Sequence, residues 1–165
     1  MLHHVAVLAT RTVLAIDVAS VTVLEHGRAR TAASTGPLAV ELDEHQYEAG
    51  YGPCLDASLS GQTVLVDTHD GRSPYPRFAA ACRRRGVRQV LSTGLPTDVG
   101  LAGALNLYTR SEQPVGNPAI ELAQTFASCA AVVAANAALQ ASTSELVDQL
   151  QAAMASRSVI DQAKG

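Results

Sequence analysis

The chain has 165 residues, a mass of 17.1 kDa and a formal net charge of −3. Apolar residues make up 47% and charged residues 16%, which is typical of a globular protein and excludes a disordered one. The slightly acidic balance argues against a generally basic nucleic-acid-binding protein. No uninterrupted apolar run reaches the ~18–20 residues that cross a bilayer, and the first residues lack the basic region of a secretory signal. We therefore expect a cytoplasmic protein without membrane contact.

Helical spacing of apolar residues predicts a first helix over residues 2–14. Alternating side chains over 20–25 and a second run at 29–34, joined by a turn at His26-Gly27, predict a β-hairpin. Pro37 then introduces a helix over 38–48, because proline suits the first turn of a helix.

Pro53 begins a short helix over 53–60, which Gly61 ends. A short strand is expected at 63–68. Pro76 then opens a helix over 76–85, whose basic last turn suits the negative end of the helix dipole.

Residues 88–95 and 101–109 are the clearest strands, and the turn at 96–100 predicts that they pair as an antiparallel hairpin. A loop at 110–117 precedes the last predicted element. The order of elements predicts an α+β fold with a central antiparallel sheet flanked by helices.

A single long helix is predicted after Asn117, because no glycine or proline occurs from residue 119 to residue 164. Residues at spacings of three and four along it follow an imperfect heptad pattern, in which Thr143 and Arg157 are polar. The positions are Leu139, Thr143, Leu146, Leu150, Ala153, Arg157 and Ile160. This pattern is typical of a coiled coil, so we expect a homodimer formed through terminal helices.

Several motifs that would carry catalysis or metal binding do not occur in the sequence. The three cysteines are odd in number and form no CxxC pair, which argues against a disulfide framework or a zinc site. None of the five histidines lies in a recognisable metal or haem motif. No nucleotide-binding, metalloprotease or nucleophile-elbow motif occurs. We therefore expect no metal, no cofactor and no enzymatic activity.

Two stretches of the sequence resemble known domains. The Gly-Tyr-Gly-Pro-Cys segment at 50–54, the strand after Gly61 and the Gly-Ala-Leu-Asn-Leu-Tyr strand at 103–108 resemble a GAF sensory domain, and the likeness covers residues 2–138. In the tail, Arg157, Ile160 and Ala163-Lys164-Gly165 resemble the start of an ANTAR domain, an RNA-binding domain of antitermination regulators.

These resemblances imply a domain organisation and a fold. Residues 1–138 form the GAF-like sensory domain, 139–155 a helical linker and 156–165 the truncated start of an ANTAR-like domain. The GAF/PAS-like fold implied has a six-stranded antiparallel sheet, terminal helices on one face and a ligand pocket on the other, with a long C-terminal helix.

The function implied is that of a cytoplasmic signal-sensing domain in a bacterial transcription antitermination regulator. It binds a small molecule or a partner and passes the signal through helices to an RNA-binding domain. RNA would be bound only through the remainder of the ANTAR-like domain, of which Arg157 and Lys164 mark the beginning. Two alternatives stay open: a GAF scaffold that binds no ligand and serves for dimerisation, and a thiol-dependent reductase of the GAF type.

Strand alternation gives the predicted hairpin two different faces. Ser92, Asn106 and Tyr108 share one face, whereas Leu91, Leu95, Leu105 and Leu107 share the other. We expect the leucine face to pack on the terminal helices and the polar face to line a ligand pocket beneath the helices over 38–48 and 76–85.

Aromatic residues near those two helices are candidates for the walls of the pocket: Tyr47, Tyr51, Tyr75 and Phe78. The alternative for the pocket as a whole is that the polar side chains satisfy one another and the aromatic side chains form part of the core.

Cys54 is a candidate reactive thiol. It lies in the first turn of a predicted helix, where the helix dipole would lower the pKa of the thiol, although the nearby Asp56 opposes this. The alternative is an inert, buried core cysteine. Cys82 and Cys129 lie on predicted helices among alanines, and we expect both to be core residues.

Overall fold

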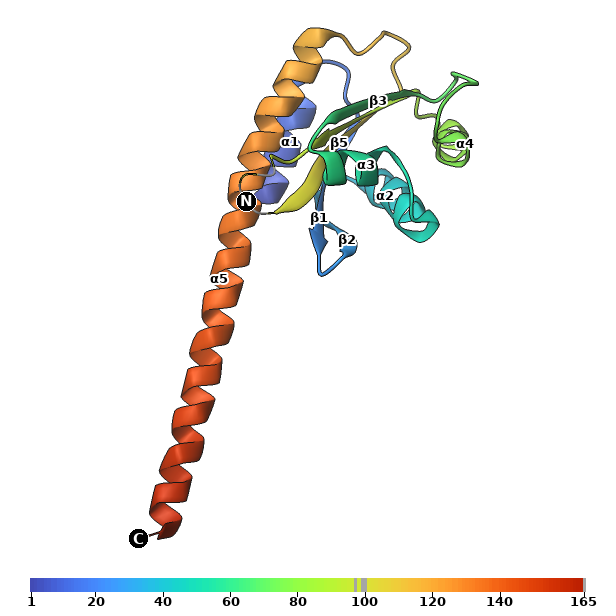
Figure 1. Cartoon of the computed structure of the whole chain (residues 1–165). Helices are drawn as coiled ribbons and strands as arrows, with labels where there is room; N and C mark the ends of the chain where they lie inside the picture. Colours follow the sequence, from blue (N-terminus) through green and yellow to red (C-terminus); the bar gives the residue numbers. More distant parts are fainter. Residues whose placement is uncertain (97, 99–100, 165) are drawn as a thin grey trace. The chain divides into compact units, whose positions relative to one another are not determined.

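The computed structural model describes residues 1–96, 98 and 101–164, which form two compact units, Met1–Ala134 and Ala135–Gly165. The predicted turn at 96–100 and Gly165 of the tail motif lie partly or wholly outside the described residues. The first unit has the predicted α+β fold, with helices on both faces of an antiparallel sheet (Figure 1).

Five strands form one sheet within the described part of the chain, in the order β2-β1-β5-β4-β3. They are β1 (Val18–Glu25), β2 (Arg28–Ser34), β3 (Thr63–Asp67), β4 (Gln89–Gly94) and β5 (Ala102–Thr109). Every neighbouring pair is antiparallel. The predicted strands are confirmed, but the sixth strand implied by the resemblance is not found among the described residues.

The helices form two layers around this sheet. They are α1 (Leu2–Thr12), α2 (Pro37–Ala49), α3 (Pro53–Ser60), α4 (Pro76–Arg84) and α5 (Asn117–Lys164). The first part of α5 runs beside α1 on one face, whereas α2, α3 and α4, which we call the lid, cover the other face (Figure 1).

The turn between β1 and β2 shows how local sequence determines the first hairpin. His26 has φ +52° and Gly27 has φ +74°. Two central residues with positive φ define a type I′ turn, whose twist matches that of paired strands. Glycine adopts this conformation without steric cost, so the hairpin is confirmed where His26-Gly27 predicts it.

The core under α1 and α5 contains the leucine face of the β4–β5 hairpin. Leu91, Leu95, Leu105 and Leu107 are buried against small side chains. The helices contribute Ala6, Ala9, Ala123, Ala127, Ala130 and Ala131. Alanine lets a helix approach the sheet closely, and the packing expected for the leucine face is confirmed.

A second core lies under the lid. Leu42 from α2, Phe78 and Cys82 from α4, and Tyr108 from β5 are buried there with Val90 of β4. Because both faces of β4 and β5 are covered, these two strands are buried along nearly their whole length. The face of the sheet opposite the leucines therefore meets the lid.

Helix α5 has 48 residues, and by length and composition it is apolar enough to cross a membrane, with a mean hydropathy of 1.5 over its most apolar 18 residues. Of those 18 residues, 28% are buried in the structure. Ala123, Ala127, Ala130 and Ala134 of α5 are buried in the first unit. A single helix of this kind is weak evidence for a membrane span.

Candidate functional site

A ladder of polar side chains crosses the lid face of the three central strands. Asn106 on β5 lies between Ser20 on β1 and Ser92 on β4 in the strand register. The hydroxyl of Ser92 donates to Oδ1 of Asn106 at 2.9 Å. Nδ2 of Asn106 donates to Oγ of Ser20 at 3.2 Å and to Oγ1 of Thr22 at 3.0 Å. All four side chains are fully buried, so their polar groups depend on one another.

The start of α3, one of the three lid helices, contacts this ladder of side chains. Nδ2 of Asn106 lies 3.3 Å from Sγ of Cys54, and the thiol donates to Oγ1 of Thr22 at 3.1 Å. The backbone N–H of Cys54 donates to Oε1 of Gln46 at 2.9 Å, which joins α3 to α2. Nε2 of Gln46 is buried and lacks a hydrogen-bond partner among the described residues.

A buried carboxylate forms the second half of the network. The hydroxyl of Tyr108 donates to Oδ1 of Asp43 at 2.5 Å, and the hydroxyl of Thr31 donates to Oδ2 at 2.8 Å. The hydroxyl of Tyr47 lies 3.1 Å from that of Thr31 and 2.7 Å from that of Thr22. We call the two halves together the lid network.

The electrostatics of the lid network follow from burial. Burial raises the pKa of Asp43 from 3.8 to about 6, against hydrogen bonds from Tyr108, Ser20 and Thr31 that lower it. Burial also raises the pKa of Tyr47 and of Tyr108, and the charge of Asp43 adds to both shifts. Asp43 is therefore the group in this network that titrates nearest to neutral pH.

Of the two alternatives for Cys54, the structure favours the buried core cysteine over the reactive thiol. Burial, together with the charge of Asp43, raises the pKa of its thiol to about 12, so the thiol is not activated. The start of α3 was expected to lower this pKa, but removal of the thiol from water outweighs the helix dipole. Cys54 is a buried core cysteine that bonds within the lid network.

The other two cysteines differ from each other. Burial also raises the pKa of Cys82 to about 12, although the neighbouring Arg83 lowers it. Cys82 is a core residue, as expected. Cys129 is exposed, so the expectation of a core residue is wrong there. The alanines that neighbour it in the sequence, Ala127, Ala130 and Ala131, occupy the buried side of α5, which leaves Cys129 outside.

The aromatic candidates lie on the lid side, as expected, but within its packing. Tyr75 and Phe78 are buried in the lid core, and the half-buried Tyr51 packs against it. The rings of Tyr51 and Tyr75 lie 6.2 Å apart, and the hydroxyl of Tyr75 donates to Oδ2 of Asp56 at 2.6 Å. This arrangement corresponds to the alternative in which the aromatic side chains form part of the core.

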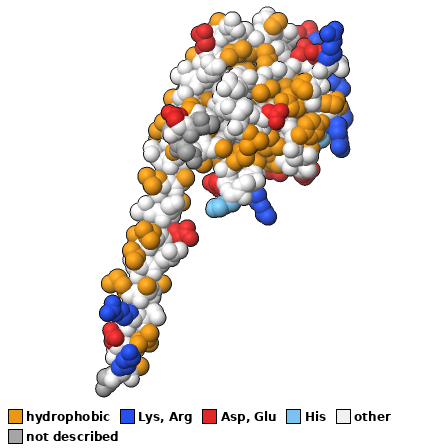
Figure 2. All heavy atoms as spheres, in the orientation of Figure 1, with side chains coloured by type: hydrophobic (Ala, Val, Ile, Leu, Met, Phe, Trp, Pro, Cys, Tyr) orange, Lys and Arg blue, Asp and Glu red, His pale blue; other side chains and the backbone are white. Residues whose placement is uncertain are grey.

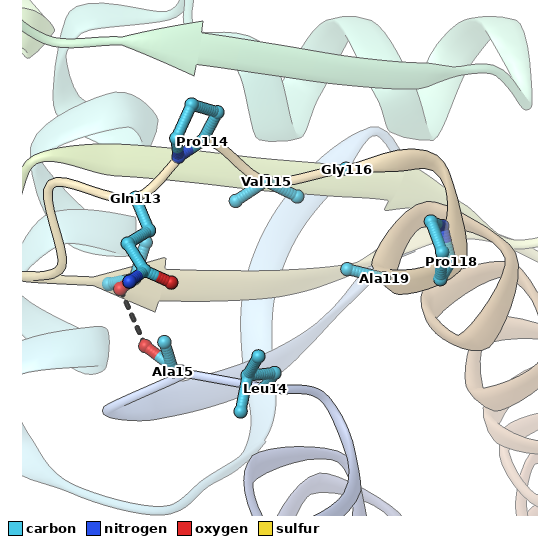
Figure 3. A pocket seen from close by; sticks show the side chains of 9 residues that line it. Leu14, Ala15, Gln113, Pro114, Val115, Gly116, Pro118 and Ala119 are labelled. Carbon is cyan, nitrogen blue, oxygen red and sulfur yellow. Dashed lines mark hydrogen bonds between the residues drawn. The ribbon is translucent and has the colours of Figure 1, made fainter.

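A cavity of about 240 Å³ lies elsewhere, between the end of α1 and the start of α5 (Figure 3). Its walls are largely apolar and include Leu14, Val115 and Ala119. The hydroxyl of Thr109 donates to the carbonyl oxygen of Ala15 at 2.5 Å at its edge. None of the residues predicted to bind a ligand lines this cavity.

Ser92, Asn106 and Tyr108 lie on the face of the sheet predicted from the sequence, whereas Asp43 and Gln46 were not predicted to join them. Both belong to α2, where acidic residues at 41, 43 and 44 surround the helix and give no sign of which one points inward. The hydroxyl of Tyr108 on β5 donates a hydrogen bond to Asp43, and only the fold brings these two side chains together. Arg157 and Lys164 are exposed on α5 in the second unit.

Comparison with known proteins adds to this geometry. No protein family and no curated protein matches the chain by sequence. Among solved structures, the chain is similar to the GAF3 domain of Slr1393 from Synechocystis in its photoproduct state, with a TM-score of 0.66 and 15% identity over 86% of this chain and 96% of that one. It is also similar to the GAF domain of a two-component sensor histidine kinase from Bacillus halodurans, with a TM-score of 0.64 and 12% identity over 82% and 92% of the two chains.

A third similar structure is an enzyme. The type II free methionine-R-sulfoxide reductase from Thermoplasma acidophilum has a TM-score of 0.57 and 14% identity over 78% of this chain and 86% of that one. At these identities the likeness shows the fold alone. The chain has the fold of GAF domains, and one of these neighbours is the GAF domain of a sensor histidine kinase.

Proposed function

We propose that this chain is the signal-sensing part of a cytoplasmic bacterial antitermination regulator. In this proposal the first unit binds a small molecule or a partner, and α5 carries the response toward an RNA-binding domain. The GAF fold supports the sensing role, and the ANTAR-like pattern around Arg157 and Lys164 supports the RNA-directed one.

The observation that carries the sensing role is the lid network. A set of buried polar groups links all three central strands to α2 and α3 through Asn106, Asp43 and Cys54. A ligand changes the balance between two packings only if it binds one of them more tightly. Groups that join the lid to the sheet offer such a difference, because a ligand that replaces one of their bonds changes how the lid packs.

The tail of this chain offers few charged groups that could bind RNA. Residues 155–165 contain two cations, Arg157 and Lys164, and one anion, Asp161. Phosphate contacts dominate nucleic-acid affinity, and each neutralised phosphate contributes roughly one unit of salt slope. This chain by itself should therefore bind a hairpin RNA weakly. Tight and strongly salt-dependent binding would contradict this part of the proposal.

The test of sensing uses the purified full chain. Calorimetric titration with linear and cyclic nucleotides, and mass spectrometry for molecules that copurify, search for a ligand directly. Asn106→Leu removes two donors and an acceptor from the lid network and should abolish specific binding there. Ala119→Leu fills the cavity near α1 instead and is the matched control. Binding that survives Asn106→Leu and is lost in Ala119→Leu would move the site to that cavity.

A scaffold without a ligand is the second candidate function. Most polar groups of the lid network bond to one another, which favours this alternative. Absence of copurified molecules and of any titration signal, together with a stable dimer, would support it over sensing. A thiol-dependent reductase has less support, because Cys54 and Cys82 are buried and burial raises the pKa of both thiols.

A further inference from the structure

A polar hollow lies at the edge of the first unit, away from the lid network. It has a volume of about 160 Å³ and is formed where the turn after α3, the end of β4 and the first part of α5 meet. Its polar lining residues are Gln62, Thr63, Thr93, Gln124 and Ser128, and two glycines and a proline complete the wall. We call it the Thr93 hollow. All of these residues belong to the first unit.

The Thr93 hollow is on the α5 side of the sheet. Strand alternation turns Thr93 toward α5, because Ser92 beside it bonds to Asn106 on the lid face. Nε2 of Gln124 on α5 donates to Oγ1 of Thr63 on β3 at 3.3 Å, which is long for a hydrogen bond. The sheet therefore separates this hollow from the lid network, and its own polar side chains are only weakly joined.

The hydroxyl of Thr93 is the reason to expect a ligand in the hollow. Thr93 is 3% exposed, and its Oγ1 has no hydrogen-bond partner among the described residues. Across the strands it lies opposite Thr63, whose hydroxyl bonds to Gln124, and Leu105, which has no polar side-chain atom. Buried polar groups are nearly always hydrogen-bonded, so an unpaired one calls for a partner. A molecule in the hollow is in position to supply it.

Main-chain bonds hold the frame of the hollow. The N–H of Gly94 donates to the carbonyl oxygen of Gln62 at 2.9 Å, and the N–H of Gly61 donates to that of Ala57 at 2.9 Å. The side chains of Gln62 and Gln124 are exposed. The walls are therefore fixed without the help of a ligand, while the hollow is open to a ligand from solvent.

The lining disfavours both charged and apolar ligands. None of the eight described residues that line the hollow is charged, and the arginine side chains visible on the first unit in Figure 2 gather mostly on the lid side. A charged ligand would lose its hydration without gaining an ionic partner. An apolar ligand would leave the Thr93 hydroxyl unpaired. Amide and hydroxyl side chains both donate and accept, and ligand hydroxyls match them in both roles.

We propose that the Thr93 hollow binds a small uncharged polyol, an open-chain molecule with a hydroxyl on each carbon. The hollow has the volume of about five water molecules, which a polyol of about four carbons replaces. One ligand hydroxyl bonds to Thr93, and others bond to the amides of Gln62 and Gln124. The bound polyol thereby connects α5 to the end of β4 and to the turn after α3.

The first experiment uses the full chain and erythritol as the probe. NMR spectra of nitrogen-15-labelled protein should show saturable shifts of the amide signals of Gln62, Thr93 and Gln124 as erythritol is added. 1,4-Butanediol has the same carbon chain without the two inner hydroxyls, and it should bind about tenfold more weakly. Absence of a saturable shift would overturn the proposal, because the hollow would then hold only water. Shifts spread evenly over the surface would overturn it as well.

Thr93→Val removes the hydroxyl and keeps the shape of the side chain. It should weaken erythritol binding about tenfold. It should leave the unfolding temperature without erythritol unchanged, because the hydroxyl has no partner among the described residues. Thr68→Val is the matched control, since Thr68 is also buried but its hydroxyl donates to the carbonyl oxygen of Val87 at 2.9 Å. This control should unfold at a lower temperature and bind erythritol as the wild type does. Equal destabilisation by the two variants would show that the Thr93 hydroxyl already has a partner and would overturn the proposal.

Gln124→Leu tests the α5 wall of the hollow independently. It removes two donors and an acceptor from the lining and should weaken erythritol binding. Gln151→Leu changes an exposed glutamine of the same helix in the second unit and should have no effect. Erythritol binding of wild-type strength in both Thr93→Val and Gln124→Leu would place the probe elsewhere and overturn the proposal.

This site does not depend on the proposed function. Asn106→Leu changes the other face of the sheet and should leave erythritol binding intact, so the two sites are tested separately. Failure of every nucleotide titration would leave the polyol site standing. Failure of erythritol to bind would leave sensing through the lid network standing.

Discussion

The hydroxyl of Tyr108 donates to the carboxylate of Asp43 at 2.5 Å and joins the central strand β5 to the lid helix α2 across 65 positions of sequence. Both side chains are fully buried. Hydroxyl groups of Thr31 and Tyr47, which are close to this pair, complete its polar surroundings. The packing of the lid is therefore linked to the protonation of one carboxyl group.

The stability of the fold should depend on pH through Asp43. Its pKa is about 6 when folded, above the ordinary value of 3.8, so the folded protein binds more protons than the unfolded one between these values. The favourable contribution is fully present below pH 4 and is lost as pH rises through 6. A shift of two units corresponds to about 3 kcal/mol in the free energy of unfolding. Urea unfolding at pH 4.5 and 7.5 measures it.

Asp43→Asn provides the control for that measurement, because other carboxyl groups also titrate in this range. The difference in unfolding free energy between wild type and variant should change by one to several kcal/mol between the two pH values, with the wild type gaining relative stability at pH 4.5. A difference that stays constant with pH would show that Asp43 titrates normally and is not buried as described.

Tyr108→Phe should destabilise the protein by about 1.5–3 kcal/mol at pH 7.5, because it removes a hydrogen bond to a charged group. It should also raise the pKa of Asp43 further, since this bond favours the charged form. The pH dependence of stability should therefore become steeper. Tyr51→Phe, at a half-buried tyrosine beside the lid core, should change the free energy of unfolding by less than about 0.5 kcal/mol.

Cys54 and Cys82 should resist alkylation in the folded protein, because both thiols are buried and their pKa values are raised to about 12. The experiment treats the Cys129→Ser variant with iodoacetamide at pH 8 and counts modified thiols by mass spectrometry. Cys54 and Cys82 should both remain largely unmodified before urea is added, and both should react in urea. Fast modification of Cys54 in native protein would restore it as a candidate reactive thiol.

Gly94→Ala should destabilise the fold through a backbone clash. A Cβ atom at this position would lie 2.2 Å from the carbonyl oxygen of Ala57 and 2.7 Å from Cα of Gly61, so α3 and β4 would have to separate. Overpacking of this kind costs about 1–3 kcal/mol. Gly71→Ala is the matched control, because its Cβ meets no atom within 4 Å. Thermal unfolding of the two variants should therefore differ clearly.

Local sequence signals determined most of the secondary structure. His26-Gly27 predicted the first turn, and Pro37, Pro53 and Pro76 marked helix starts that the structure confirms within a residue. These signals act over a few residues, through allowed φ values and capping, and they need no tertiary contact. Alternation also determined which residues of β4 and β5 share a face, because successive side chains in a strand point to opposite sides.

Tertiary structure decided which polar groups meet. The sequence offered Asn106 and Tyr108 for one face of the sheet, but the choice of Asp43 and Gln46 among the polar residues of α2 depends on how that helix packs. Tertiary structure also decided between the two alternatives for Cys54, because desolvation raises the pKa of a thiol more than the start of a short helix lowers it. Local sequence pattern determines turns, helix starts and the alternation of side chains along a strand. Burial and the distance between hydrogen-bond partners arise only after distant segments have packed together.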